Sequence, residues 1–145
     1  QVFQYVKDGG VALVQYNVNS NMGTSQYGPY PMRITRDRVT EEDALVHFLL
    51  PNDPALNYPN KISPADFDGW VQERGLYFAE DMDAKYRSPL AFADKNESQN
   101  KGSLLITDYG KGKFVYTSLA FFRQLPAGVP GAYRLFVNLL AKEVK

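Results

Sequence analysis

Two short β-type segments joined by glycines, near the carboxyl end of the chain, constrain the fold most strongly. Residues 103–107 and 113–118 are rich in β-branched and aromatic side chains, and the sequence Tyr-Gly-Lys-Gly lies between them at 109–112. Glycine adopts the positive φ angles that a tight hairpin turn requires. The pattern therefore predicts two antiparallel strands that lie side by side.

An amphipathic helix is predicted directly after this hairpin. Its apolar positions follow the i, i+3, i+4, i+7, i+8 spacing of one helix face, and they are Ala132, Leu135, Phe136, Leu139 and Leu140. Pro130 suits the first turn of such a helix. We expect the helix to pack on the sheet and close the domain.

The start of the chain predicts a second helix that leads into a buried strand. Residues 2–6 carry apolar side chains at helical spacing, Gly9 and Gly10 follow, and residues 11–16 form an apolar run. A glycine end and an uninterrupted apolar run are typical of a helix followed by a strand of a parallel sheet. No capping residue precedes Val2, so Gln1 is expected to be a cut point inside a longer chain. Together these elements predict an α/β layer fold.

The middle of the chain predicts three more strands and one more helix. The strands are expected at 33–39, 44–50 and 89–93, the second of them bounded by a proline. Ser63, Pro64 and Asp66 form the start signal of a helix, in which Phe67 and Trp70 would share one face until Gly75 ends it. Residues 94–102 are polar and charged, which is typical of a loop.

Composition excludes several classes of function. The chain has 145 residues, enough for one domain, and 16 basic residues balance 16 acidic ones, so no overall positive charge attracts nucleic acid. No apolar stretch approaches the ~18 residues of a membrane span. There is no cysteine and only one histidine, His47, which leaves thiol chemistry impossible and a histidine-based metal site or catalytic triad difficult to build.

No metal or cofactor site is predicted. Asp66 and Asp68 are close in sequence, as are Glu80, Asp81 and Asp83, but helix capping explains Asp66 and a calcium loop needs more oxygen ligands at set spacing. The glycine-rich segments match neither a phosphate-binding loop nor a dinucleotide motif.

Two groups of residues are candidates for ligand binding. Residues 17–32 form a long polar loop at the carboxyl end of a predicted strand, where α/β folds bind ligands, and with the strand's last residue they supply Tyr16, Asn17, Asn19 and Tyr27. The second group combines aromatic, acidic and guanidinium side chains, and its members are Trp70, Glu73, Arg74 and Arg123. Flat rings beside polar groups suit stacking on a sugar. The alternative is that the rings belong to the core and that Glu73 and Arg74 form a structural ion pair.

Three stretches of the sequence resemble a known family. They are VFQYVKDGGVALVQYN at the start, NKISPADFDGWVQERGLYF at 60–78 and YGKGKFVYTSLAFFRQLPAGVPGAYRLFVNLLA at 109–141. Together they resemble the C-terminal region of bacterial LmbE-like (PIG-L family) proteins, which are zinc-dependent N-acetylglucosaminyl deacetylases. The resemblance implies a three-layer, mostly parallel flavodoxin-like sheet of the class I glutamine amidotransferase type, incomplete at its N-terminal side.

The resemblance also implies a role beside another domain. In that family an N-terminal deacetylase domain carries an Ala-His-Pro-Asp-Asp metal motif, which this sequence lacks, and an amidotransferase would need a nucleophilic cysteine, which is also absent. The chain is therefore expected to be a non-catalytic accessory domain of an exported bacterial protein, aiding carbohydrate placement or packing against the deacetylase domain. An exposed sheet edge would allow pairing with another chain, including a second copy.

Two other functions remain open at this point. One is a stand-alone hydrolase that uses Glu73 with Asp66 or Asp108 as acid and base. The other is a structural dimerisation module with a large apolar interface.

Overall fold

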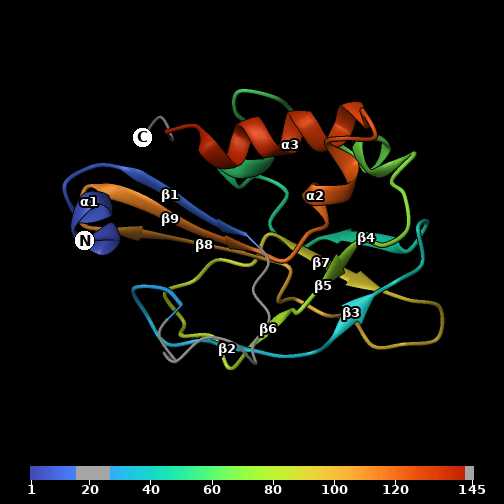
Figure 1. Cartoon of the computed structure of the whole chain (residues 1–145), viewed down its shortest axis with the longest axis horizontal. Helices are drawn as coiled ribbons and strands as arrows, with labels where there is room; N and C mark the ends of the chain where they lie inside the picture. Colours follow the sequence, from blue (N-terminus) through green and yellow to red (C-terminus); the bar gives the residue numbers. More distant parts are fainter. Residues whose placement is uncertain (16–26, 143–145) are drawn as a thin grey trace.

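The largest sheet has three strands and contains the hairpin predicted from sequence. The computed structural model describes residues 1–15 and 27–142. The strand order is β1 (Val11–Gln15), β9 (Gly112–Thr117) and β8 (Leu104–Tyr109), as Figure 1 shows. β8 and β9 are antiparallel, whereas β1 runs parallel to β9 with Val11 opposite Lys113. The hairpin and the parallel strand at the start of the chain are thus confirmed.

The hairpin turn is closed by glycine and covered by the first helix. Gly110 has a φ of +59°, and Tyr109 pairs with Gly112 across the turn. A Cβ atom on Gly112 would lie 1.9 Å from the carbonyl oxygen of Val6, so only glycine fits where the helix approaches. The turn therefore depends on glycine both for its backbone angles and for space.

Helix α1 (Val2–Lys7) ends as the glycine pair predicts. Gly9 has a φ of +116°, its N–H donates to the carbonyl of Val6, and the N–H of Gly10 donates to the carbonyl of Tyr5. This pair of bonds is a Schellman motif, which satisfies the last carbonyls of a helix. The motif turns the chain directly into β1.

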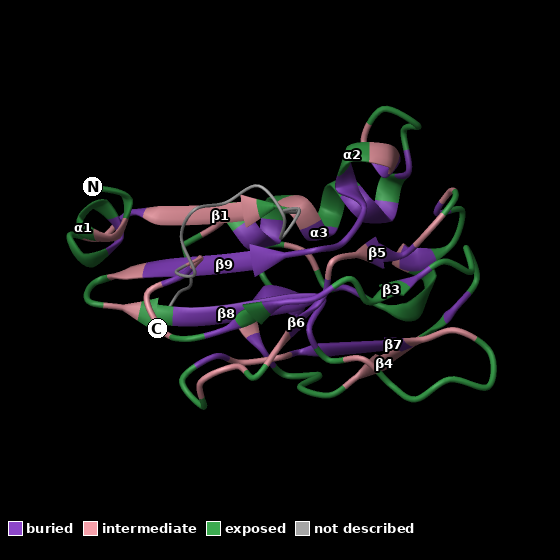
Figure 2. Ribbon diagram, turned by 60° about the horizontal axis from the view of Figure 1, so that its bottom comes forward, coloured by how far each residue is buried: buried purple, intermediate pink, exposed green. Residues whose placement is uncertain are grey.

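Different kinds of structure cover the two faces of this sheet. Helix α3 (Pro130–Leu140) packs on one face, together with the short helix α2 (Phe121–Gln124) that precedes it, as predicted for the amphipathic segment (Figure 1). The other face packs on helix α1, through Val6, and on segments without helix, through Met32, Ile34 and Tyr86. Figure 2 shows β8 and β9 buried along most of their length and β1 at intermediate burial.

The remaining strands form three separate antiparallel pairs. They are β2 (Arg33–Ile34) with β6 (Ala79–Glu80), β3 (Arg38–Val39) with β5 (Gly75–Leu76), and β4 (Leu45–Phe48) with β7 (Leu90–Ala93). The predicted strands at 44–50 and 89–93 are therefore present in shortened form, and the segment 33–39 is divided into two strands.

The predicted fold class is wrong. Within the described residues only β1 and β9 are parallel, and the other strand pairs are antiparallel, so the chain does not form a mostly parallel flavodoxin-like sandwich. A parallel sheet needs a crossover of a dozen or more residues, usually a helix, between successive strands. Between β2 and β8 the only helical elements are the 3₁₀ turns η1 (Pro54–Leu56) and η2 (Pro64–Phe67), which are too short to form such crossovers.

The helix predicted from residue 64 to Gly75 also stops early. Its start signal is real, since the Asp66 carboxylate accepts the N–H of Ser63 at 2.8 Å. The chain then leaves the helical conformation, and Gly69 takes a φ of +75°. Phe67 and Trp70 instead enter the core side by side, with ring centroids 5.2 Å apart. The apolar spacing therefore reflects aromatic packing after one turn rather than the face of a longer helix.

Candidate functional site

Two of the candidate ligand residues, Trp70 and Arg74, lie in the core. Arg74 is 5% exposed, and its Nε and Nη2 atoms donate to the carbonyl oxygen of Ala44 at 3.2 and 3.0 Å. Its Nη1 atom donates to the carbonyl of Phe67, and its guanidinium carbon lies 5.9 Å from the centre of the Trp70 ring. These contacts connect three segments of the chain, which is a structural role for both side chains.

Burial also changes the ionisation of Arg74. Removal from water lowers the pKa of Arg74, and the negative charges of Asp43 and Asp68 act in the opposite direction. The ordinary pKa of arginine is so far above 7 that the guanidinium group remains charged at neutral pH. The core thus holds a cation whose direct partners are backbone carbonyls and aromatic rings.

Glu73 pairs with Arg123, another candidate, and not with Arg74. The Arg123 Nε atom lies 2.7 Å from the Glu73 carboxylate, and the Glu73 side chain is largely buried. The neighbouring Gln124 side chain accepts the N–H of Val71 at 2.7 Å and donates to its carbonyl. This ion pair connects α2 to the segment after Trp70. Sequence spacing could not predict the pair because its partners are fifty residues apart.

Of the four candidates from the polar loop, only Tyr27 lies among the described residues. Tyr16, Asn17 and Asn19 lie outside the described residues. Tyr27 is half-buried and packs against the cluster on the sheet face opposite α3. Its ring is therefore not a free stacking platform.

The carboxylates of the hydrolase alternative have other partners. Asp66 caps η2 and forms an ion pair with Arg134 at 2.9 Å, and Glu73 is bound to Arg123. Asp108 lines a cavity at the hairpin turn, and none of the four cavities considered is lined by two of these carboxylates. No observation therefore supports an acid–base pair among them.

Residues 1–15 and 27–142 contain neither a metal-binding cluster nor a membrane-spanning helix. No cluster of three or more histidine, aspartate or glutamate side chains there is placed to hold a metal ion. None of the helices in those ranges has the length and apolar character needed to cross a bilayer.

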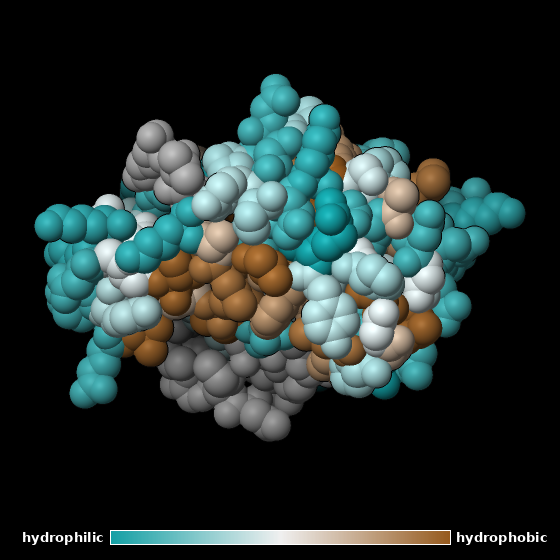
Figure 3. Space-filling view, turned by 90° about the horizontal axis from the view of Figure 1, so that it is seen from above, coloured by the Kyte–Doolittle hydropathy of each residue, from teal (hydrophilic) through white to brown (hydrophobic). Residues whose placement is uncertain are grey.

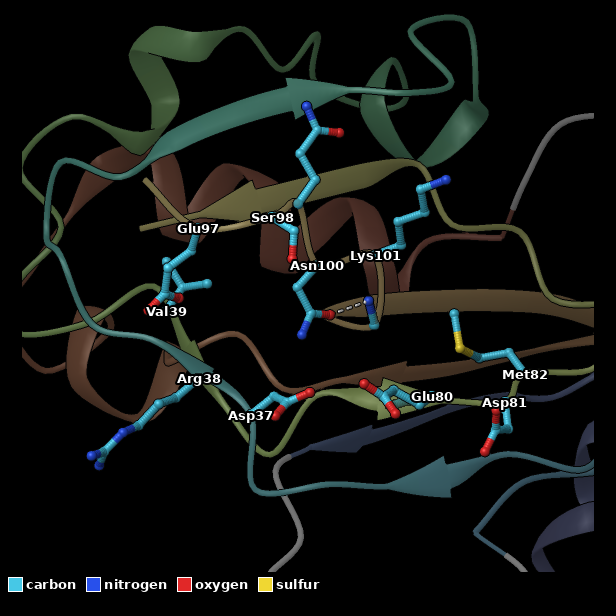
Figure 4. A pocket seen from close by; sticks show the side chains of 13 residues that line it. Asp37, Arg38, Val39, Glu80, Asp81, Met82, Glu97, Ser98, Asn100 and Lys101 are labelled. Carbon is cyan, nitrogen blue, oxygen red and sulfur yellow. Dashed lines mark hydrogen bonds between the residues drawn. The ribbon is translucent and has the colours of Figure 1, made fainter. Parts of the chain in front are cut away.

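A polar groove of about 460 Å³ lies between the β2–β3 segment, β6 and residues 97–102 (Figure 4). Its walls carry acidic side chains, which are Asp37, Glu80, Asp81 and Glu97. Two of them are neutralised by Arg33, which lies 2.8 Å from Glu80 and 3.0 Å from Asp81 and whose pKa is raised mainly by the hydrogen bond to Asp81. The groove is accessible and polar, but its acidic groups alone do not define a binding site.

The outer edge of β1 is paired with no strand among residues 1–15 and 27–142. The Lys113 N–H donates to the Gly10 carbonyl, and in a parallel pair this bond sets the alternation along the strand. The backbone groups of Ala12 and Val14 therefore face β9, while those at 11, 13 and 15 point away from it.

A stripe of apolar side chains on α3 lies on the outer surface of the same region. Tyr133, Val137 and Leu140 are each about half exposed, on the side of α3 that does not pack on the sheet. Their spacing places them along one side of α3. Figure 3, which views the α3 side, shows hydrophobic side chains gathered near the middle of this face. We call the β1 edge and this stripe together the edge surface.

Comparisons with known proteins do not assign a family. No family model and no curated protein matches the chain. A solved structure with partial similarity is the cold-adapted β-galactosidase from Rahnella sp. R3, with a TM-score of 0.47 and 15% sequence identity. The alignment covers 95% of this chain and 20% of that one, so the chain spans about a fifth of its length. This similarity is too low to carry over a fold or an activity, and the LmbE-like resemblance stays a prediction.

Proposed function

We propose that this chain is a non-catalytic accessory domain that packs against the deacetylase domain of an LmbE-like (PIG-L) protein through the edge surface. The edge of β1 that pairs with no described strand is the observation that carries the proposal. Its five residues, Val11–Gln15, include no charged residue and no proline. Natural sheets protect exposed edges with such residues, and an unprotected edge suits a strand supplied by a partner.

The α3 stripe extends this edge into a larger apolar surface. Leu13 of β1 packs against the same core cluster as Leu135 and Leu139 of α3, so the strand and the helix adjoin. Val137 and Leu140 are half exposed on the outer side of α3, and a partner that both pairs with β1 and reaches over α3 would cover them. Docking there would satisfy backbone hydrogen bonds and remove apolar area from water in one step.

The choice of partner rests on the resemblance and on the placement of the candidate residues. LmbE-like proteins carry a deacetylase domain ahead of the region that this chain resembles. Packing is favoured over carbohydrate placement because Trp70 and Arg74 lie in the core and Glu73 is held by Arg123. Four of the residues expected to contact a sugar, Trp70, Glu73, Arg74 and Arg123, thus have partners within the chain.

Binding to a separately produced LmbE-like deacetylase domain tests the proposal. Calorimetry should detect a complex with the wild-type chain. Val137→Glu places a charge in the stripe, and Gln15→Pro removes an N–H that points away from β9 while leaving the ladder intact. We expect each variant to weaken the complex at least tenfold. Leu45→Glu is the matched control, since it makes the same kind of change at an exposed residue of β4 and should leave binding unchanged.

Two results would contradict the proposal. One is the absence of any complex between the wild-type chain and the deacetylase domain. The other is a wild-type dimer in light scattering that Val137→Glu converts to a monomer, because the edge surface would then bind a second copy of this chain.

A further inference from the structure

The arginines of this chain divide into two groups by their partners. There are seven arginines, and the guanidinium groups of five of them have a hydrogen-bond or ion-pair partner. Four pair with carboxylates and one, Arg74, with backbone carbonyls; the four are Arg33, Arg87, Arg123 and Arg134. Arg36 and Arg38 form no side-chain hydrogen bond or ion pair in the part of the chain that the structure describes.

These two arginines line the same cavity. The cavity is about 330 Å³ in volume and lies at the pairing of β3 with β5, where Arg38 is opposite Leu76. Arg36 and Arg38 form one wall, and Leu76 and Tyr77 form the other. Two guanidinium groups beside one cavity repel each other, and an anion between them would remove that repulsion.

The acidic residues nearby face a different cavity. Asp37 lies between the two arginines in sequence but lines the polar groove, together with Glu80 and Asp81, whereas Arg38 lines both the groove and this cavity. Figure 4 shows the Arg38 side chain extending away from Asp37 and Glu80. The chain as a whole has no net charge, so this positive site is a local arrangement and not part of a basic surface.

Both walls of the cavity are held in place by hydrogen bonds. The Thr35 N–H donates to the Phe78 carbonyl at 2.9 Å, and the Phe78 N–H donates to the Asp37 carbonyl at 3.2 Å, which holds the segment that carries the arginines. On the other wall the Tyr116 hydroxyl donates to the Tyr77 carbonyl at 2.9 Å. Tyr77 has a φ of +61°, an uncommon conformation for a tyrosine, so the fold holds its backbone in this conformation.

We propose that this cavity binds an oxyanion, a carboxylate or a phosphate group, through Arg36 and Arg38. Guanidinium groups bind both anions through paired, charge-assisted hydrogen bonds. The half-buried Tyr77 and Leu76 side chains supply an apolar wall beside that charge, which suits an anion attached to a sugar ring. The site is separate from the edge surface and does not depend on the proposed function.

Arginine Nε–H resonances of the isotopically labelled chain test this site, because each guanidinium reports separately. The probes are inorganic phosphate, trigalacturonic acid as a carboxylate sugar, and maltotriose as an uncharged control. We expect phosphate, the carboxylate sugar, or both to shift the resonances of Arg36 and Arg38 while those of Arg33 stay in place. Maltotriose should shift neither the Arg36 nor the Arg38 resonance. Comparison of the shifts caused by phosphate and by the carboxylate sugar shows which of the two anions the cavity prefers.

Variants separate binding at this cavity from general attraction of anions. Arg36→Gln with Arg38→Gln should weaken binding at least tenfold, and Arg33→Gln is the matched control, a basic residue of β2 whose loss should leave the affinity within twofold. Both changes lie on exposed side chains, so the fold is expected to survive. The proposal is overturned if no anion shifts the two resonances, or if the double variant binds as tightly as the wild type.

Discussion

Replacement of Arg74 by methionine distinguishes a structural arginine from one that is available to a ligand. The side chain donates to the carbonyls of Ala44 and Phe67 within the core. Methionine fills a similar volume but leaves both carbonyls without that donor, and each unsatisfied buried acceptor costs about 1 to 3 kcal/mol. Loss of the contacts between the guanidinium and the Phe67 and Trp70 rings adds about 1 kcal/mol.

An opposing effect reduces this total. The lowered pKa of Arg74 shows that its burial carries a desolvation cost, which methionine would remove. We therefore expect Arg74→Met to lower the free energy of unfolding by about 2 to 4 kcal/mol. For a chain of this size, the corresponding fall in Tm is roughly 5 to 15 °C.

Urea unfolding followed by fluorescence measures this directly, because Trp70 is the single tryptophan and contacts Arg74. Arg36→Met is the control, since it removes an exposed arginine and should change stability by less than about 0.5 kcal/mol. A value for Arg74→Met as small as that of the control would refute the structural role. Arg74 would then have to be reconsidered as a ligand residue.

Three other substitutions test packing and ionisation. Asn138→Leu should cost roughly 3 kcal/mol in urea unfolding, because the buried amide bonds three backbone groups of the neighbouring segment. Gly131→Ala should destabilise by about 2 kcal/mol or more in the same assay despite alanine's helix preference, because its Cβ would lie 1.8 Å from the Asp66 carbonyl oxygen; a gain in stability would contradict this contact. Burial raises the pKa of Tyr86 to about 12, so the unfolded chain loses this proton near pH 10 while the folded chain keeps it. Stability should then fall between pH 10 and 12 by at most about 3 kcal/mol, and the wild-type curve should be steeper there than that of Tyr86→Phe.

The elements predicted correctly are those whose signals are local. Gly110 and Gly112 define the hairpin turn, Gly9 ends α1, and the apolar stripe from Ala132 defines α3. Each signal lies within the element it determines or directly beside it. Local signals are therefore sufficient for the hairpin, for β1 as a strand and for the helix that covers the sheet, but not for the pairing of β1 with β9.

The middle of the chain could not be predicted in the same way. β2 and β3 are two residues long, too short to show an alternating pattern, and their partners lie about forty residues further along the chain. The helix after Ser63 illustrates a second limit, because a start signal carries no information about where the helix ends. The fold class was wrong because the family resemblance implied a mostly parallel sheet, whereas only the pairing of β1 with β9 is parallel among the described strands.

The candidate site shows the same division. The sequence indicates the aromatic and charged side chains near residue 70 as candidates for ligand binding. Their partners in the structure, Ala44 and Arg123, are contributed by distant segments. Arg36 and Arg38 showed only an alternation of basic residues along one segment. Their shared cavity exists because β3 meets β5, and that pairing has no local signal in the sequence.

The partnership of β1 with β9 has a consequence for synthesis of the protein. β1 is synthesised about a hundred residues before β9, so those residues must emerge from the ribosome before the two strands can pair. Until then an uncharged, apolar segment remains without its sheet. Nascent chains that end before residue 112 should thus be the form most dependent on chaperones, and moving the first fifteen residues to the carboxyl end by circular permutation should shorten that delay.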